Sequence, residues 1–191
     1  MTGNNTEIRV LAIDPTTSGF GFVVLEGRER LIDWGVKEVA GEKRSSCLRA
    51  IASLMNRYQP DLVAVESPIM GKSRRCERVR ELIGSIVKLA IERRVRTRAI
   101  SRAQVREVFI QEGARTKHEI ATAITVRLPE LAPRLPRFRQ PWMPEDGRMA
   151  IFDALAIALT FYELNAKRQK ERLSTLGINH DVETEEAHSR N

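Results

Sequence analysis

The feature that most constrains this chain of 191 residues is a stretch near its C-terminal end that is apolar on every face except for one carboxylate. Residues 149–159 read MAIFDALAIAL, with Asp153 in the middle. A helix that is hydrophobic all round packs inside a core, where an ionised carboxylate is costly unless a positive charge compensates it. No Lys or Arg lies three or four residues from Asp153, so the compensating charge comes from elsewhere. A divalent metal ion fits such a position; a buried Asp that caps a neighbouring loop is the alternative interpretation.

Two further carboxylates favour the metal interpretation. Asp14 ends the β-rich segment 8–15, and Glu66 ends the short apolar run 62–66. Both runs read as strands of a sheet interior, and α/β folds place ligands where central strands end. Three acids from two strand ends and one buried helix supply hard oxygen ligands. These suit Mg²⁺ or Mn²⁺ rather than Zn²⁺.

The charge of the chain predicts an anionic partner. The formal net charge is +7, and twelve Lys or Arg oppose four acids between residues 72 and 107. A charge run is usually only a solvated face, but an excess that begins beside Glu66 is typical of phosphate-backbone contacts. The basic residues that we expect to contact DNA lie after Glu66 and in a proline-rich loop at 128–145: Lys72, Arg74, Arg75, Arg78, Arg134, Arg137 and Arg139. In that loop Phe138 and Trp142 either stack on bases or pack the loop onto the body.

The composition of the chain also indicates its cellular compartment. The sequence has no apolar run near the length of a bilayer span, and residues 1–5 do not read as a signal peptide. Its two cysteines, Cys47 and Cys76, do not form a disulfide framework. We therefore expect a cytoplasmic protein with no membrane partner.

The apolar periodicity predicts an α/β fold. We expect strands at 7–15, 19–26, 30–39, 62–66 and 98–100, and helices at 43–57, 74–94, after Ser101, at 117–127 and from 149 to about 167. The first three strands form an antiparallel meander. The order predicts a mixed five-stranded sheet flanked by helices on both faces, in one domain of residues 1–167. The charged tail 168–191 has no apolar periodicity and is expected to be disordered.

Four short motifs resemble the RuvC family of Holliday junction resolvases, which has a ribonuclease H-like fold. They are the AIDP of residues 12–15 with the GFG of 19–21, the AVE of 64–66, the GARTKHEI of 113–120 and the DALAIA of 153–158. Their order and spacing over residues 7–165 carry most of the resemblance. An actin-like or sugar-kinase-like ATPase also begins with such a strand, but it needs a second glycine-rich phosphate loop and a much longer chain.

The resemblance implies a metal-dependent endodeoxyribonuclease that resolves four-way DNA junctions by paired symmetric cuts. Asp14 is expected to bridge two Mg²⁺ ions, for which Mn²⁺ can substitute, and Glu66 and Asp153 to hold one ion each. Lys117 would neutralise charge on the scissile phosphate, and His118 would contact the DNA beside it. Cutting two strands symmetrically implies a homodimer. The apolar stripe of the 74–94 helix either forms its seam or only covers the sheet, and a branch-migration motor is implied as a partner by resemblance alone.

Three departures from the family pattern leave alternatives open. Thr16 replaces the glycine after Asp-Pro, and Pro68-Ile69-Met70 replaces an aromatic after the second acid. Ala150 stands where a second helix Asp is common. Asp146, with Glu145 beside it, is a substitute fourth ligand if the backbone bends before the helix; otherwise the two are acids favoured by the helix dipole. The alternatives are therefore a broader flap or RNA–DNA hybrid nuclease, or a catalytically impaired junction-binding protein.

Overall fold

The protein is built on one mixed sheet, seen in a computed structural model that describes residues 7–39, 43–67, 77–140 and 142–175. The strands are β1 (Arg9–Pro15), β2 (Gly19–Glu26), β3 (Arg30–Glu38), β4 (Leu62–Glu66) and β5 (Arg96–Ile100), in the order β3-β2-β1-β4-β5. The first three form an antiparallel meander, and β1, β4 and β5 run parallel. The predicted mixed five-stranded sheet is confirmed.

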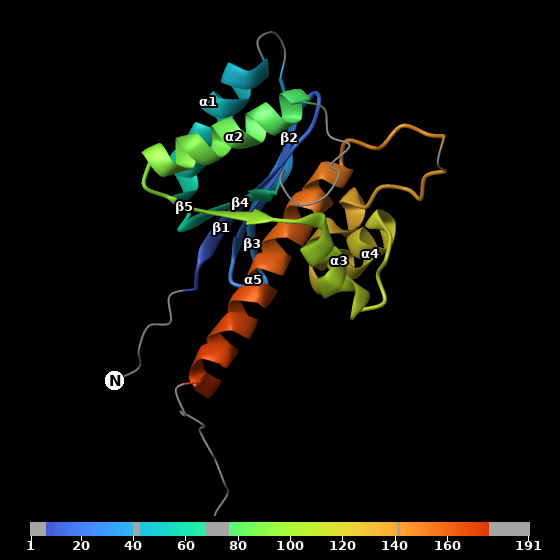
Figure 1. The fold of residues 1–191 in the computed structure, drawn as a ribbon. Coiled ribbons are helices and arrows are strands. Elements are labelled where there is room, and N and C mark those ends of the chain that lie inside the picture. The colour runs from blue at the N-terminus through green and yellow to red at the C-terminus, as the bar shows by residue number, and fades with distance from the viewer. Residues whose placement is uncertain (1–6, 40–42, 68–76, 141, 176–191) are drawn as a thin grey trace, which may run out of the picture.

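Helices cover both faces of this sheet (Figure 1). Helices α1 (Lys43–Tyr58) and α2 (Glu77–Glu92) pack on one face, and α3 (Arg102–Ile110), α4 (Lys117–Arg127) and α5 (Met149–Thr175) lie on the other. A 3₁₀ helix, η1 (Pro129–Arg134), starts the segment that was expected to be loop. Residues of β1 alternate between two cores, with Val10 and Ala12 in the α5 core and Leu11 and Ile13 in the α1–α2 core. This is the period-two pattern of a strand buried on both sides.

Helix α5 is the buried helix that its apolar sequence predicted. By length and composition it could cross a membrane, but 72% of its most apolar window is buried inside the protein, as in a core helix. Its predicted end near Lys167 was wrong, because the helix continues to Thr175 with its last turns exposed. Apolar periodicity marks burial, whereas Arg, Gln, Lys and Glu propagate a helix without it. Residues 176–191, where most of the expected tail falls, lie outside the described residues.

The apolar stripe of α2 is used within the monomer. Its residues Val79, Leu82, Ile83, Ile86 and Ala90 are buried in the core with α1 and the sheet. Covering the sheet therefore accounts for this stripe, and its role as a dimer seam stays a prediction.

Candidate active site

Asp14 and Glu66 emerge at the same edge of the sheet. Strands β1 and β4 pair in parallel with Ile13 opposite Val65, so the next residues along the two strands are these acids. Both lie almost entirely inside the protein, with 3% of Asp14 and 6% of Glu66 exposed. Both carboxylates therefore lie near the ends of neighbouring parallel strands.

Asp153 approaches this edge because α5 crosses β2 in close contact. Gly21 of β2 lies opposite Asp14, and a Cβ on Gly21 would stand 2.3 Å from the carbonyl oxygen of Ala150. Only glycine permits this approach, which places α5 against the sheet one turn before Asp153. Asp14, Asp153, Glu145 and Asp146 line one hollow, together with residues of the 16–18 turn and the end of β3.

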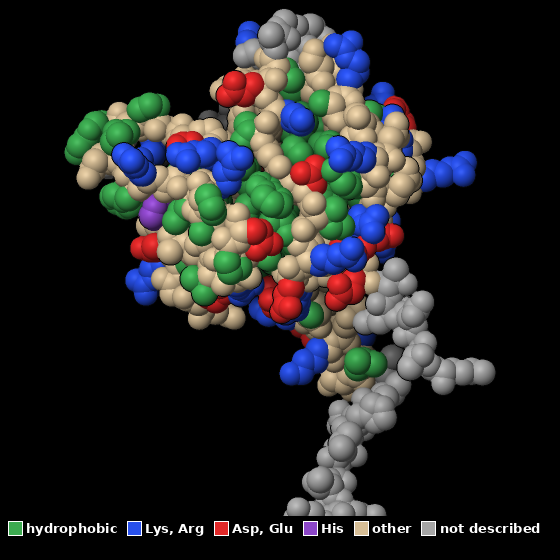
Figure 2. Space-filling model, turned by 180° about the vertical axis from the view of Figure 1, so that it is seen from behind, with side chains coloured by type: hydrophobic (Ala, Val, Ile, Leu, Met, Phe, Trp, Pro, Cys, Tyr) green, Lys and Arg blue, Asp and Glu red, His purple; other side chains and the backbone are tan. Residues whose placement is uncertain are grey.

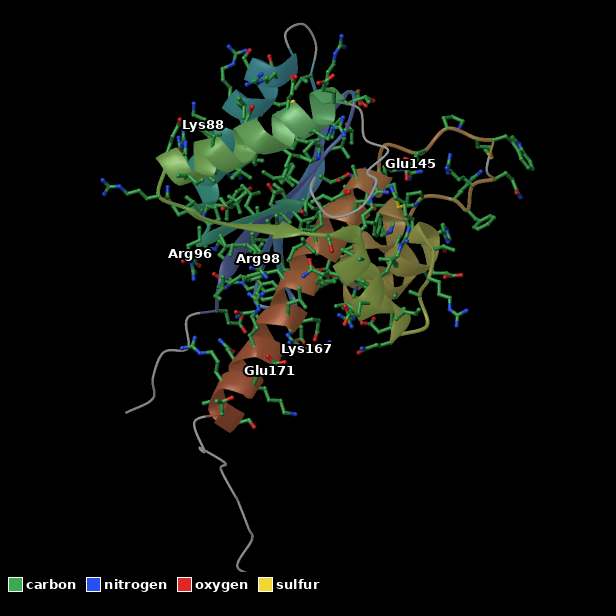
Figure 3. All side chains as sticks on the ribbon, in the orientation of Figure 1. Lys88, Arg96, Arg98, Glu145, Lys167 and Glu171 are labelled. Carbon is green, nitrogen blue, oxygen red and sulfur yellow. The ribbon has the colours of Figure 1, made fainter. Side chains whose placement is uncertain are left out.

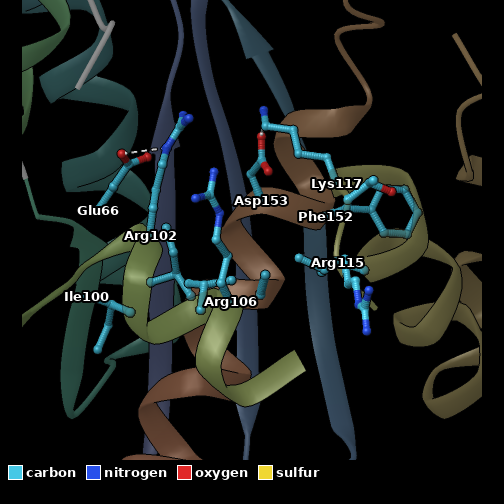
Figure 4. A pocket seen from close by; sticks show the side chains of 13 residues that line it. Glu66, Ile100, Arg102, Arg106, Arg115, Lys117, Phe152 and Asp153 are labelled. Atoms are coloured by element: carbon cyan, nitrogen blue, oxygen red, sulfur yellow. Dashed lines mark hydrogen bonds and ion pairs between the residues drawn. The ribbon is translucent and has the colours of Figure 1, made fainter. Parts of the chain in front are cut away.

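A second cavity opens on the other side of Asp153. It has a volume of about 180 Å³ and is lined by Glu66 and Asp153, by apolar residues of α4 and α5, and by four basic residues, Arg102, Arg106, Arg115 and Lys117. Figure 4 shows Arg106 pointing toward the same space as the side chains of Arg102 and Asp153. Asp153 lines both hollows, one together with Asp14 and the other together with Glu66.

Lys117 is a positively charged partner of Asp153. It comes from another segment of the chain, as expected from the lack of Lys or Arg three or four residues from Asp153. A capping box between Thr116 and Glu119 starts α4, so that Lys117 is its first residue. Its Nζ donates to Oδ2 of Asp153 and to Oε1 of Glu145, each over 2.7 Å. Burial alone would lower the pKa of Lys117, but attraction and hydrogen bonding to Asp153 and Glu145 outweigh it and raise the pKa above the ordinary lysine value.

Arg102 is a site residue that sequence reasoning missed. Its Nε donates to Oε1 of Glu66 over 2.9 Å, and the pair is drawn in Figure 4. The predicted N-cap at Ser101 is confirmed, with a complete capping box to Gln104, and it makes Arg102 the first residue of α3. The available signal was the spacing of Arg102 and Arg106, four residues apart and thus on one helix face. The sequence gave no sign that this face turns toward Glu66.

Asp146 pairs with Arg148, two residues further along the chain. Its carboxylate accepts from the Arg148 guanidinium at 2.6–3.1 Å and from the Arg148 backbone N–H at 2.9 Å. Hydrogen bonding to Arg148 holds the pKa of Asp146 below its usual range, against the opposing effect of burial. Residues 146–149 form a turn closed by the Met149 N–H on the Asp146 carbonyl, at 2.9 Å. The backbone therefore bends before α5, which is the condition under which Glu145 or Asp146 could serve as a fourth metal ligand. Of these two acids, Glu145 contacts Lys117.

The predicted DNA-contact residues fall into three groups. Lys72, Arg74 and Arg75 lie outside the described residues. Arg78 is exposed in the first turn of α2, and Arg134, Arg137 and Arg139 are exposed around the loop before α5. His118, beside Lys117, contacts the Pro136 carbonyl through a ring nitrogen at 3.1 Å.

The donor set fits a hard divalent cation in its chemistry. Asp14 and Glu66 are almost fully buried, Asp153 lines a hollow with each of them, and all three offer only oxygen ligands, which Mg²⁺ prefers. Within the part of the chain that is described, no three acidic, His or Cys side chains already stand at metal-binding spacing. Glu66 and Asp153 instead have cationic side chains at hydrogen-bond distance. An ion that binds here must therefore share these carboxylates with Arg102 and Lys117 or displace them.

Comparisons with known proteins agree with the motif resemblance. No protein-family model matches the chain. A crossover junction endodeoxyribonuclease RuvC from Thermomicrobium roseum is 28% identical over 175 residues, 87% of this chain and all of that protein. The structure of Thermus thermophilus RuvC is 26% identical with a TM-score of 0.57, over 83% of this chain and 97% of that one. The same T. thermophilus protein in complex with a Holliday junction substrate has a TM-score of 0.58 at 24% identity, over 83% of this chain and 96% of that one, and supports the fold.

Relatedness at about this level extends over most of the chain. The protein is therefore a distant homologue of the RuvC crossover junction resolvases, with the ribonuclease H-like fold.

Proposed function

We propose that this protein is a metal-dependent endodeoxyribonuclease that resolves four-way DNA junctions. The observation that carries the proposal is that Asp153 lines one hollow with Asp14 and a second cavity with Glu66, and that this second cavity is also lined by basic side chains. Homology to crossover junction endodeoxyribonucleases supports this reaction. The basic net charge supports a nucleic acid as the substrate.

Asp14, Glu66 and Asp153 are the residues that would hold Mg²⁺, or Mn²⁺ in its place. Glu145 and Asp146 border the same hollow as Asp14 and are the candidates for a further ligand. Divalent ions bound there would supply an activated water and stabilise the leaving 3′ oxygen. Asp146 would first have to release Arg148, whereas Glu145 would have to release Lys117.

Lys117 has the position and charge to stabilise the transition state. Its raised pKa keeps the ammonium protonated at neutral pH, and it lies within reach of the same carboxylate that would hold a metal ion. A phosphate that enters the cavity would meet Lys117 on one side and Arg102 and Arg106 on the other. These cations would orient the phosphate and neutralise the charge that develops on it.

Contacts beyond the scissile phosphate would come from exposed basic residues. We assign this role to Lys72, Arg74, Arg75, Arg78, Arg134, Arg137 and Arg139, with His118 at the start of α4. Two symmetric cuts need two active sites, so the acting form is proposed to be a homodimer. Scattering measurements with and without junction DNA test this, and a monomer in both conditions would contradict it.

The experiment that tests the function replaces Asp14 with Asn. A labelled four-way junction is incubated with the wild-type protein and with Asp14→Asn in Mg²⁺, and binding is measured in parallel by gel shift. The variant should lose cleavage while it binds the junction as tightly as the wild type or more tightly. The substitution removes a charged ligand but leaves the basic surface unchanged.

Glu130→Gln is the matched control, because it removes one acidic charge at an exposed position of η1. It should cleave at the wild-type rate. Retained nuclease activity in Asp14→Asn would overturn the site assignment. A wild-type protein that binds junctions without cutting them would instead favour the catalytically impaired alternative associated with Ala150.

A further inference from the structure

The loop between η1 and α5, residues 135–145, exposes large apolar side chains. Within its described part, Phe138 is 67% exposed, Trp142 80% and Met143 47%. Of the two interpretations from sequence, packing onto the body does not account for such exposure. Figure 2 shows hydrophobic and basic side chains together on a lobe that projects from the body, beside a histidine. Exposed apolar groups gathered in this way mark interaction sites.

Both ends of the loop contact the first turn of α4, which fixes the position of the loop. On one arm the His118 ring contacts the Pro136 carbonyl at 3.1 Å and the Phe138 ring edge-on, with centroids 5.4 Å apart. On the other arm Glu145 pairs with Lys117 over 2.7 Å; it lies where the loop returns to α5 (Figure 3).

The tip of the loop is closed by backbone contacts. The Met143 N–H donates to the Gln140 carbonyl over 3.0 Å, and the Arg139 guanidinium donates to the Met143 carbonyl. Trp142 lies within this turn. The loop therefore presents Trp142 and Phe138 outward on a tied frame, which lowers the entropic cost of ordering them on a ligand.

The charge of the loop identifies the kind of ligand. From residue 131 to residue 144 the sequence has three arginines and no acid, and Arg137 and Arg139 flank Phe138. All three arginines are exposed. Aromatic faces combined with basic side chains are the means by which proteins bind unpaired nucleotides, with bases stacked on the rings and phosphates on the cations. Lys117 joins Glu145 at the base of this loop to Asp153, so the base of the loop borders the candidate active site.

We propose that Phe138 and Trp142 form a stacking platform for unpaired bases of the DNA substrate at its branch point. The identity of that DNA rests on the proposed function; the stacking itself does not. The platform lies on a different segment from the residues after Glu66, where Pro68-Ile69-Met70 offers no ring. In this chain the loop before α5 supplies the aromatic surface.

The test uses the full-length protein carrying Asp14→Asn, so that no DNA is cut, and compares Phe138→Ala, Trp142→Ala and the double variant. Leu173→Ala is the matched control, because it removes an apolar side chain that is 51% exposed near the far end of α5. The probes are a four-way junction with 2-aminopurine at the branch point, the matched linear duplex and a single-stranded oligonucleotide. Thermal unfolding of each variant confirms an intact fold.

Each ring removed should weaken binding to the junction and to the single strand by about fivefold or more, since stacking contributes about 1–3 kcal/mol per base. Affinity for the duplex should stay unchanged, and the fluorescence change of 2-aminopurine on binding should disappear in the double variant. Equal loss on all three probes, or no loss on the junction and the single strand, would overturn the proposal. Loss only of self-association or of binding to anionic vesicles would also overturn it, in favour of a protein or membrane contact.

The two proposals fail in different ways. If the protein with an unsubstituted loop binds junctions no better than duplex, the resolvase proposal fails. Binding to the single-stranded oligonucleotide then still tests whether Phe138 and Trp142 stack on bases. If the double variant keeps the full junction preference of the unsubstituted protein, the stacking proposal fails and the resolvase proposal stands.

Discussion

Lys117 and Asp153 lie 2.7 Å apart, Nζ to Oδ2, although one begins α4 and the other stands within α5. The same ammonium contacts Glu145 at the base of the exposed loop. One side chain therefore joins the candidate metal site to the loop that we propose binds DNA.

Replacement of Lys117 should reduce cleavage much more than binding. Lys117→Met removes a cation that contacts Asp153, and loss of one preorganised charge or donor at a developing oxyanion costs about 10²–10³ in rate. Single-turnover cleavage of a junction in Mg²⁺ measures this loss. Lys88→Met, at an exposed position of α2, is the control and should cleave normally. Cleavage by Lys117→Met at the wild-type rate would remove Lys117 from the mechanism.

Replacement of Gly21 should destabilise the fold through its contact with α5. In Gly21→Ala the added Cβ would meet the backbone and side chain of Ala150 at 2.3–2.6 Å. Overpacking of this kind typically costs about 1–3 kcal/mol, and a displaced α5 would also move Asp153 and reduce cleavage. Urea unfolding measures the free energy.

Gly84→Ala is the control for Gly21→Ala. Gly84 lies on the exposed side of α2, and a Cβ there would meet nothing within 4 Å. Alanine should stabilise that helix by about 0.5–1 kcal/mol. Equal effects of the two substitutions would contradict the close approach of α5 to β2.

The pair of Asp146 and Arg148 predicts a specific dependence of stability on pH. Because the folded pKa of Asp146 is lowered, its contribution is complete above the ordinary Asp pKa of about 3.9. It is lost as pH falls through the folded pKa. Carbon-detected NMR titration should show this lowered pKa, and Arg148→Met should raise it toward the usual range, since only the backbone N–H of residue 148 would still donate to Asp146. Arg80→Met, at an exposed position of α2, should leave it unchanged. An ordinary pKa for Asp146 in the wild type would rule out the pair in solution.

Divalent cations should bind in competition with Arg102. Calorimetric titration with Mn²⁺ should detect uptake by the wild-type protein and little or none by Asp14→Asn. Arg102→Gln removes the guanidinium that contacts the buried Glu66, so this variant should bind Mn²⁺ more tightly than the wild type. Weaker binding by Arg102→Gln would mean that Arg102 orients Glu66 for the metal rather than competing with it.

The positions of the acids could be predicted because local patterns determine them. Asp14 and Glu66 end short apolar runs that are typical of buried strands, and parallel pairing brings such ends together. Asp153 is the one charged residue in an otherwise apolar stretch of helix. The sequence alone therefore predicted that a cation from another segment, or a metal ion, compensates its charge. Lys117 was a candidate only through the resemblance, because its reach to Asp153 depends on the packing of α4 against α5.

Other features depend on tertiary contacts that no local pattern specifies. The face of α3 that carries Arg102 and Arg106 was not predicted to point at Glu66. The sequence also could not show whether Phe138 and Trp142 are exposed or buried, because an aromatic side chain in a proline-rich loop can be either. The pairing of Asp146 with Arg148 is local, but it forms only because the backbone turns before Met149 instead of continuing as helix.

The most direct test of the account is cleavage by the wild-type protein of labelled four-way junctions in Mg²⁺ and then in Mn²⁺. Matched linear duplex, flap and RNA–DNA hybrid substrates are incubated alongside. The account predicts paired symmetric nicks confined to the four-way junction. Equal cutting of flaps or hybrids would contradict junction resolution and indicate a broader nuclease with the same metal site. Binding to the junction without cutting in either metal would contradict the catalytic role of Asp14, Glu66 and Asp153.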